Sequence, residues 1–175
     1  MLSSSGRVPA TRERQVVRPL PPYEPFSHGT ANHRAVRSDP IMPDMWISAC
    51  DNPRALERLY GSTEGLESVD LHEVVLHRDG PRLVLRFDLP RFPDRPVPPR
   101  WSPAANVLQA EVSFWGVADL RLAGWTPGGR GVLAATTAGN ENQVTFTSEG
   151  VELRANFRTA HLDGLSAYTN EERES

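Results

Sequence analysis

The 175-residue chain contains no lysine, a single cysteine and no long apolar run. A transmembrane helix needs roughly 18 to 20 consecutive apolar residues, and no stretch approaches that length. Cys50 has no partner for an internal disulfide and no second thiol with which to build a thiolate zinc site. These absences argue against a helical membrane protein and a disulfide-stabilised secreted domain. We therefore expect a soluble protein of the reducing cytoplasm.

Residues 1–45 differ from the rest of the chain in composition. Seven of the 16 prolines and six arginines lie there, and the apolar residues show no helical or strand periodicity. Such a segment buries too little apolar surface to offset the entropy of ordering its backbone, about 1 to 2 kcal/mol per residue. We expect a disordered leader, and it lacks the apolar run of a secretory signal. Two alternatives stay open: a polyproline ligand at PLPPYEP, or a true start codon at Met42 or Met45.

Residues 46–168 are expected to form one domain, followed by a frayed acidic tail at 169–175. Asn52 and Pro53 predict the cap and first position of one short helix, which ends at Gly61. The clearest hairpin joins strands at 69–77 and 82–89 through Asp79-Gly80-Pro81. Six prolines between residues 90 and 103 predict a loop. Further strands are predicted at 106–115, 132–137, 143–147 and 151–160, and at the edge over 162–168. Residues 117–125 form either another strand or a bulged extension of 106–115 through Gly116.

About seven short strands with one N-terminal helix predict a mainly β (α+β) fold. The strands alternate apolar and polar residues, which is typical of antiparallel sheets with one solvated face. Two architectures fit this pattern: an antiparallel sandwich and a strongly bent sheet.

Patterns that carry catalysis or bind metals are missing from the sequence. No Gly-x-Ser-x-Gly, His-Glu-x-x-His or dinucleotide fingerprint occurs. His72 and His77 are five residues apart, so on a strand of period two they should point to opposite faces and share no metal. We expect a protein without catalytic activity, metal or cofactor. An enzyme would need Cys50, His161 or one of the strand histidines to converge with a carboxylate in a cleft.

The charge balance of the folded part argues against nucleic-acid binding. Residues 46–175 carry 18 carboxylic acids against 13 arginines, whereas phosphate contacts need clustered positive charge. An acidic surface suits a basic protein partner instead. The acidic tail contributes part of this surplus, so the domain itself is more nearly balanced.

Five segments of the chain carry a family resemblance: Trp46, 52–61 (NPRALERLYG), 71–76 (LHEVVL), 80–90 (GPRLVLRFDLP) and 100–101 (RW). Together they resemble the Imm50 family of bacterial immunity proteins over most of residues 46–168. The resemblance implies a cytoplasmic protein encoded beside a polymorphic toxin, which binds the toxin's catalytic domain and blocks it. It implies no active site of its own.

Two functions therefore compete. The leading hypothesis is a stoichiometric toxin inhibitor, with expected partner contacts at Asp70, Glu73, Asp88, Asp94 and Trp101. The alternative is a small-molecule or carbohydrate-binding β-sandwich that stacks its ligand on Trp101, Trp115 or Trp125. A cluster of these rings around one pocket would favour ligand binding, and a flat acidic face would favour inhibition.

Overall fold

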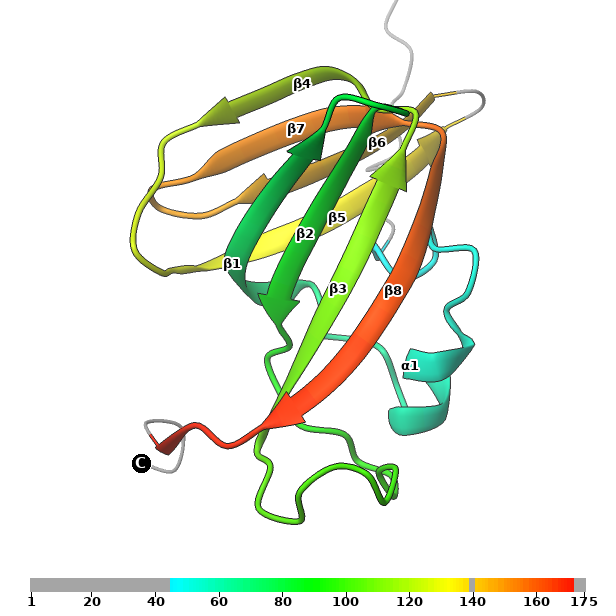
Figure 1. The fold of residues 1–175 in the computed structure, drawn as a ribbon, viewed down its shortest axis with the longest axis vertical. Helices are drawn as coiled ribbons and strands as arrows, with labels where there is room; N and C mark the ends of the chain where they lie inside the picture. The colour runs from blue at the N-terminus through cyan, green and yellow to red at the C-terminus, as the bar shows by residue number, and fades with distance from the viewer. Residues whose placement is uncertain (1–44, 139–140, 172–175) are drawn as a thin grey trace, which may run out of the picture. The chain divides into compact units, whose positions relative to one another are not determined.

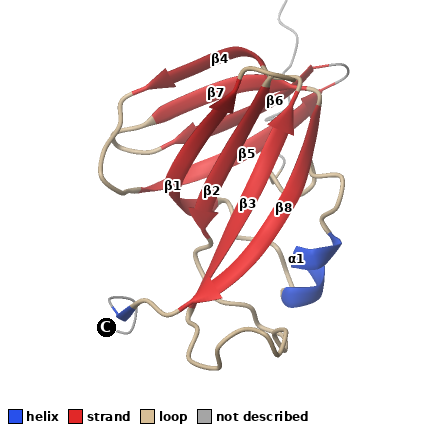
Figure 2. Cartoon of the chain, viewed as in Figure 1, coloured by secondary structure: helices blue, strands red, loops and turns tan. Residues whose placement is uncertain are grey.

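The computed structural model describes residues 45–138 and 141–171. Most of the expected leader and residues 172–175 of the expected tail lie outside the described residues. One helix and eight strands follow in order (Figure 2): α1 (Arg54–Leu59), β1 (Ser68–His77), β2 (Arg82–Asp88), β3 (Val107–Trp115), β4 (Ala118–Ala123), β5 (Arg130–Ala138), β6 (Glu141–Thr147), β7 (Glu152–Phe157) and β8 (Thr159–Tyr168). The mainly β class with one short helix is confirmed. Within the described part, no helix has the length and apolar character needed to cross a membrane.

All eight strands belong to one antiparallel sheet in the order β4-β7-β6-β5-β1-β2-β3-β8. β1 and β5 pair only over Ser68–Asp70, so the sheet bends sharply where they meet. The bend separates a front half (β1, β2, β3, β8) from a back half (β5, β6, β7, β4), which lie one behind the other (Figure 1). A single bent sheet thus forms two layers. The fold is a strongly bent sheet by its strand pairing, and its two layers resemble a sandwich.

The core fills the space between the two halves. It takes Leu83, Leu85 and Phe87 from β2 and Leu133 and Phe146 from the back half. Each such side chain contributes about 1.5 to 3 kcal/mol when fully buried. Trp46 is also fully buried, with its ring edge-on to Phe87 at 5.1 Å between centroids. α1 adds its own buried leucines to the same cluster.

Two local expectations are wrong. The expected strand over 151–160 is two strands, because the chain passes at Arg158 from β7 in the back half to β8 in the front half. Asn52 does not cap α1: the residue at the cap position is Pro53, with no side-chain cap bond. The Asn52 amide instead bonds to the backbone of Leu162 on β8.

Candidate functional site

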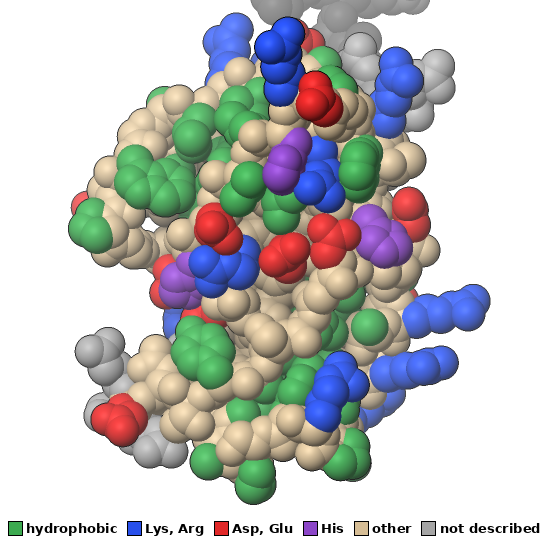
Figure 3. Space-filling model, viewed as in Figure 1, with side chains coloured by type: hydrophobic (Ala, Val, Ile, Leu, Met, Phe, Trp, Pro, Cys, Tyr) green, Lys and Arg blue, Asp and Glu red, His purple; other side chains and the backbone are tan. Residues whose placement is uncertain are grey.

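The outer surface of β1, β2, β3 and β8, called the front face below, is an open sheet surface covered with polar side chains. On β2, Arg82, Val84, Arg86 and Asp88 point outward because the leucines and phenylalanine between them lie in the core. The register of β3 places Trp115, Ser113, Glu111 and Gln109 beside these four residues. Figure 3 shows acidic, basic and histidine side chains mixed in a band across this face.

A β-bulge on β1 adds one histidine to the front face. The β1–β2 register shifts between Leu71 and Glu73, which leaves His72 as the extra residue. Its imidazole contacts Asp88, while His77 lies opposite the outward-pointing Arg82. The expectation that His72 and His77 point to opposite faces is therefore wrong, because the bulge shifts the alternation by one residue.

A second bulge brings an acid from β8. The β3–β8 register shifts between Glu111 and Val112, where Asp163 is the extra residue. The hydroxyl of Ser113 donates a hydrogen bond to Asp163 Oδ2 at 2.7 Å, which holds this carboxylate on the front face.

Asp88 is the centre of a hydrogen-bond network on this face. It is only 3% exposed, and a buried carboxylate is stable only when donors surround it. His72 Nε2 lies 2.9 Å from Oδ2, and the Tyr168 hydroxyl donates to the same oxygen. Gln109 Nε2 donates to Oδ1 at 3.0 Å. Asp88 therefore holds three other side chains in place and contributes little surface itself.

The network continues from Gln109 through Arg86 to Glu73. Arg86 Nη1 donates to Gln109 Oε1 at 3.2 Å, and Arg86 Nε donates to Glu73 Oε2 at 2.8 Å. These bonds join β1, β2 and β3 across the front face. Because both ends of the guanidinium are engaged, Arg86 is fixed in one orientation and its charge is matched by Glu73.

Negative charge exceeds positive charge in this band. It holds five carboxylates, Asp70, Glu73, Asp88, Glu111 and Asp163, around a single arginine. Residues 45–171 carry 16 carboxylic acids and 12 arginines, an excess of four acids. The band has the same excess, because it holds five acids and one arginine. One oxygen of Asp70 is buried and has no hydrogen-bond partner among the described residues.

An aromatic residue and an arginine border the band at the hairpin end of the face. Trp115 is 41% exposed, and the Arg82 guanidinium lies 4.8 Å from the centre of its ring. Trp, Tyr and Arg are the residue types that most often anchor protein interfaces. With Tyr168 on β8, the front face therefore combines charged groups with interface anchors.

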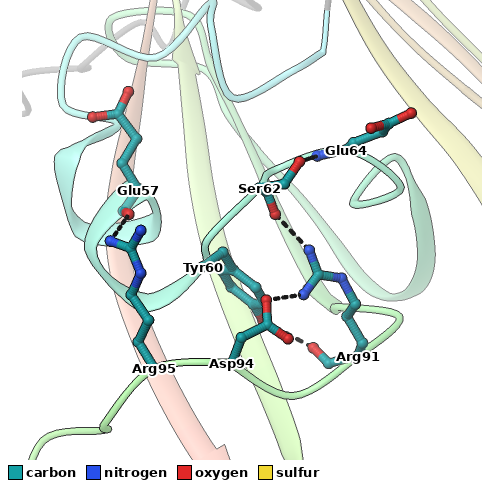
Figure 4. Close-up of polar contacts among 7 residues, drawn as sticks. All are labelled: Glu57, Tyr60, Ser62, Glu64, Arg91, Asp94 and Arg95. Carbon is teal, nitrogen blue, oxygen red and sulfur yellow. Dashed lines mark hydrogen bonds and ion pairs between the residues drawn. The ribbon is translucent and has the colours of Figure 1, made fainter.

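Asp94 lies away from the front face, in the loop that joins β2 to β3. It pairs with Arg91, whose guanidinium also donates to the Ser62 carbonyl beside α1 (Figure 4). The hydrogen bond from Arg91 lowers the pKa of Asp94. The Tyr60 hydroxyl donates to the Arg91 carbonyl at 2.9 Å, and burial raises the pKa of Tyr60 above its ordinary value. This cluster fastens the proline-rich loop to α1.

The tryptophans considered for ligand stacking lie in separate places. Trp101 belongs to the loop before β3 and packs half-buried against the core, with Arg100 at 5.6 Å from its ring. Trp115 is at the other end of β3, about 30 Å along the strand. Trp125 is 55% exposed in the loop between β4 and β5. Trp101 and Trp115 therefore do not form one platform.

Among the residues that an enzyme would need, His72 lies 2.9 Å from the Asp88 carboxylate on the open front face, whereas Cys50 and His161 have other neighbours. Burial raises the pKa of the Cys50 thiol to about 12, so it stays protonated at neutral pH. His161 Nε2 lies 3.2 Å from the Asn52 amide, and the Ser113 hydroxyl bonds to Asp163 rather than to a histidine. In the described part of the chain, no group of three or more His, Cys, Asp or Glu is arranged to hold a metal ion.

The family model for Immunity protein 50 (Imm50) matches residues 52–168. The chain belongs to the Imm50 family. No curated protein and no solved structure matches it. The Imm50 region runs from Asn52, which bonds to β8, to Tyr168, which bonds to Asp88, and so includes the whole front face. Membership of Imm50 indicates an immunity function and a protein partner in general terms.

Of the residues expected to contact that partner, the structure brings three together and leaves two apart. Asp70, Glu73 and Asp88 share the front face, whereas Asp94 and Trp101 lie in the loop before β3. Glu111 and Asp163 join the first three and were not expected. Glu111 could have been found from its polar position in the alternation of residues 107–115, but no local pattern marks Asp163.

Proposed function

We propose that this Imm50 protein binds the catalytic domain of one cognate bacterial toxin and blocks it, and that the front face is the surface that binds. Imm50 membership supports the class of function. The observation that carries the choice of face is the acidic surplus, which is concentrated on one open sheet surface around the Asp88 network.

The dimensions of the front face suit this function. Four strands about 4.8 Å apart and about nine residues long give a surface of roughly 20 Å by 30 Å. This area is comparable with the roughly 800 Å² that each partner contributes to a stable protein complex. A toxin domain seated on such a surface is blocked by steric occlusion, without any chemistry by the immunity protein.

Fixed side chains favour tight binding at this face. Ordering a mobile side chain on association costs about 0.5 to 1.5 kcal/mol. His72, Gln109, Arg86 and Glu73 are already held by bonds to one another or to Asp88. Binding a partner therefore requires little further ordering of these side chains.

Co-expression with the toxin domain encoded beside this gene tests the proposal. Wild-type protein is expected to restore growth of a bacterial host, and Glu111→Arg on the front face is expected to abolish the rescue. Glu111 has no ion pair in the described part of the chain, so this change breaks no internal bond. Circular dichroism of both proteins checks that the variant remains folded.

Glu152→Arg is the matched control. Glu152 is exposed on β7, in the back half of the sheet, and the substitution changes the net charge equally. It is expected to leave rescue intact. If Glu152→Arg loses rescue and Glu111→Arg keeps it, the binding surface lies on the back half instead. If the toxin kills equally with and without the wild-type protein, the immunity function is wrong.

A further inference from the structure

A small hollow lies on the front face above Gly164. Gly164 is directly opposite Glu111 on the neighbouring strand, and a Cβ placed at Gly164 would meet no atom within 4 Å. The missing side chain leaves a hollow of about 180 Å³, lined by Arg86, Gln109, Glu111 and Ser166 among others. We call it the Gly164 notch.

The size of the notch favours a single side chain as its occupant. Pockets for small-molecule ligands usually measure about 300 to 1,000 Å³. The notch is smaller and opens onto a sheet face that carries many polar groups. It therefore suits the end of one long side chain from a protein seated on the front face.

The charges around the notch favour a cationic side chain. Glu111 lies across the sheet from Arg86, but Arg86 is engaged by Glu73 and Gln109 instead. Asp163, next to Gly164 in the chain, accepts a hydrogen bond from the neutral Ser113 hydroxyl. Neither Glu111 nor Asp163 has an arginine or histidine within ion-pair distance in the described part of the chain.

We propose that the toxin surface seated on the front face is basic and inserts one arginine or lysine side chain into the Gly164 notch, beside Glu111 and near Asp163. This inference rests on the proposed function. It follows from charge complementarity, since the front face holds most of the acidic surplus of the domain, Glu111 lines the notch and Asp163 precedes Gly164 in the chain. The rest of the acidic band would attract the same basic surface over a longer range.

Association and dissociation rate constants for the neighbouring toxin domain, purified in a catalytically inactive form, test this proposal. The full-length protein with Glu111→Gln and Asp163→Asn keeps the shape of both side chains but removes two charges. We expect its association rate constant at low ionic strength to fall roughly tenfold. The dependence of that rate on salt should weaken as well, because fewer charges steer the encounter.

Gly164→Leu tests the notch separately from its charge. The backbone of Gly164 is not left-handed and the space beside it is open, so leucine can be accommodated in the free protein. We expect the dissociation rate constant to rise by roughly tenfold or more, because filling the notch excludes the partner's side chain. Gly61→Leu is the matched control, since Gly61 is also exposed with open space but lies beside α1.

The outcomes separate the two proposals. If the toxin domain binds and either notch variant keeps wild-type rate constants, the notch inference is overturned and the proposed function stands. If the wild-type protein does not bind the toxin domain at all, both are overturned. A Gly61→Leu protein that loses binding as strongly as Gly164→Leu would also overturn the assignment to the notch.

Discussion

Asn52 makes both of the hydrogen bonds to Leu162 that a neighbouring strand would make. Its Oδ1 accepts from the Leu162 amide at 2.8 Å, and its Nδ2 donates to the Leu162 carbonyl at 3.0 Å. The Asp51 amide also donates to the Ala160 carbonyl at 2.9 Å. β8 is the last strand of the front half, so this short segment covers an edge that would otherwise be open to pairing with another chain.

Replacing Asn52 with alanine should destabilise the domain. The substitution leaves two backbone groups of Leu162 without partners, and each costs about 1 to 3 kcal/mol when it is shielded from water. Because both bonds are only partly buried, we expect a total near the lower end, about 2 kcal/mol. Urea unfolding followed by tryptophan fluorescence measures it. Asn52→Asp keeps the acceptor and loses the donor, so its loss should be smaller, and an unchanged Asn52→Ala midpoint would contradict this role.

The Asp88 network offers a second test of stability. Asp88→Asn replaces one acceptor oxygen with a donor that faces other donors, so we expect a loss of about 2 kcal/mol. Tyr168→Phe removes a single donor to the same carboxylate and should cost about half as much. Both are measured by urea unfolding. Glu152→Gln, at an exposed position of β7, serves as the control and should leave the midpoint unchanged. Equal stability of Asp88→Asn and wild type would show that the network does not support the face.

The β1–β2 hairpin could be predicted because its information is local. Leu83, Leu85 and Phe87 alternate with Val84, Arg86 and Asp88, and the Asp79-Gly80 turn joins the two strands. This pattern places Asp88 on a solvated face, whereas Glu73 reaches that face only because of the bulge at His72. The local pattern of β2 and the bulge of β1 together bring Asp70, Glu73 and Asp88 to the front face.

The bulges and the bend could not be predicted in the same way. One extra residue reverses the alternation without changing the residue types, so His72 and Asp163 carry no local signal. The break at Arg158 depends on which distant strands lie beside β7 and β8. Such pairing depends on contacts between residues far apart in the sequence. Ser113 and Asp163, which are 50 residues apart, make one of them.

Gly131 should be irreplaceable at the bend between the two halves. It pairs with Val69 where β5 meets β1, and a Cβ there would lie 2.5 Å from the Phe146 ring and 2.6 Å from the Thr147 carbonyl oxygen. Because one of these neighbours is backbone, we expect Gly131→Ala to destabilise the domain by about 1 to 3 kcal/mol. Thermal unfolding measures the change. Gly61→Ala, where no atom lies within 4 Å, should be neutral, and equal melting temperatures for both variants would refute the steric argument.

Alkaline pH should reveal the burial of Cys50. Burial raises the pKa of its thiol from 9.0 to about 12, so the unfolded chain loses this proton first. The stabilising contribution is therefore complete below pH 9 and is lost as pH rises toward 12, at a rate of at most about 1.4 kcal/mol per pH unit. Cys50→Ala removes this contribution, so its free energy of unfolding should fall less steeply between pH 9 and 11 than that of the wild type. Tyr60, whose pKa is also raised by burial, remains in both proteins and keeps some slope. Urea unfolding across this range measures both slopes, and identical slopes would mean that the thiol ionises as readily in the folded protein as in the unfolded chain.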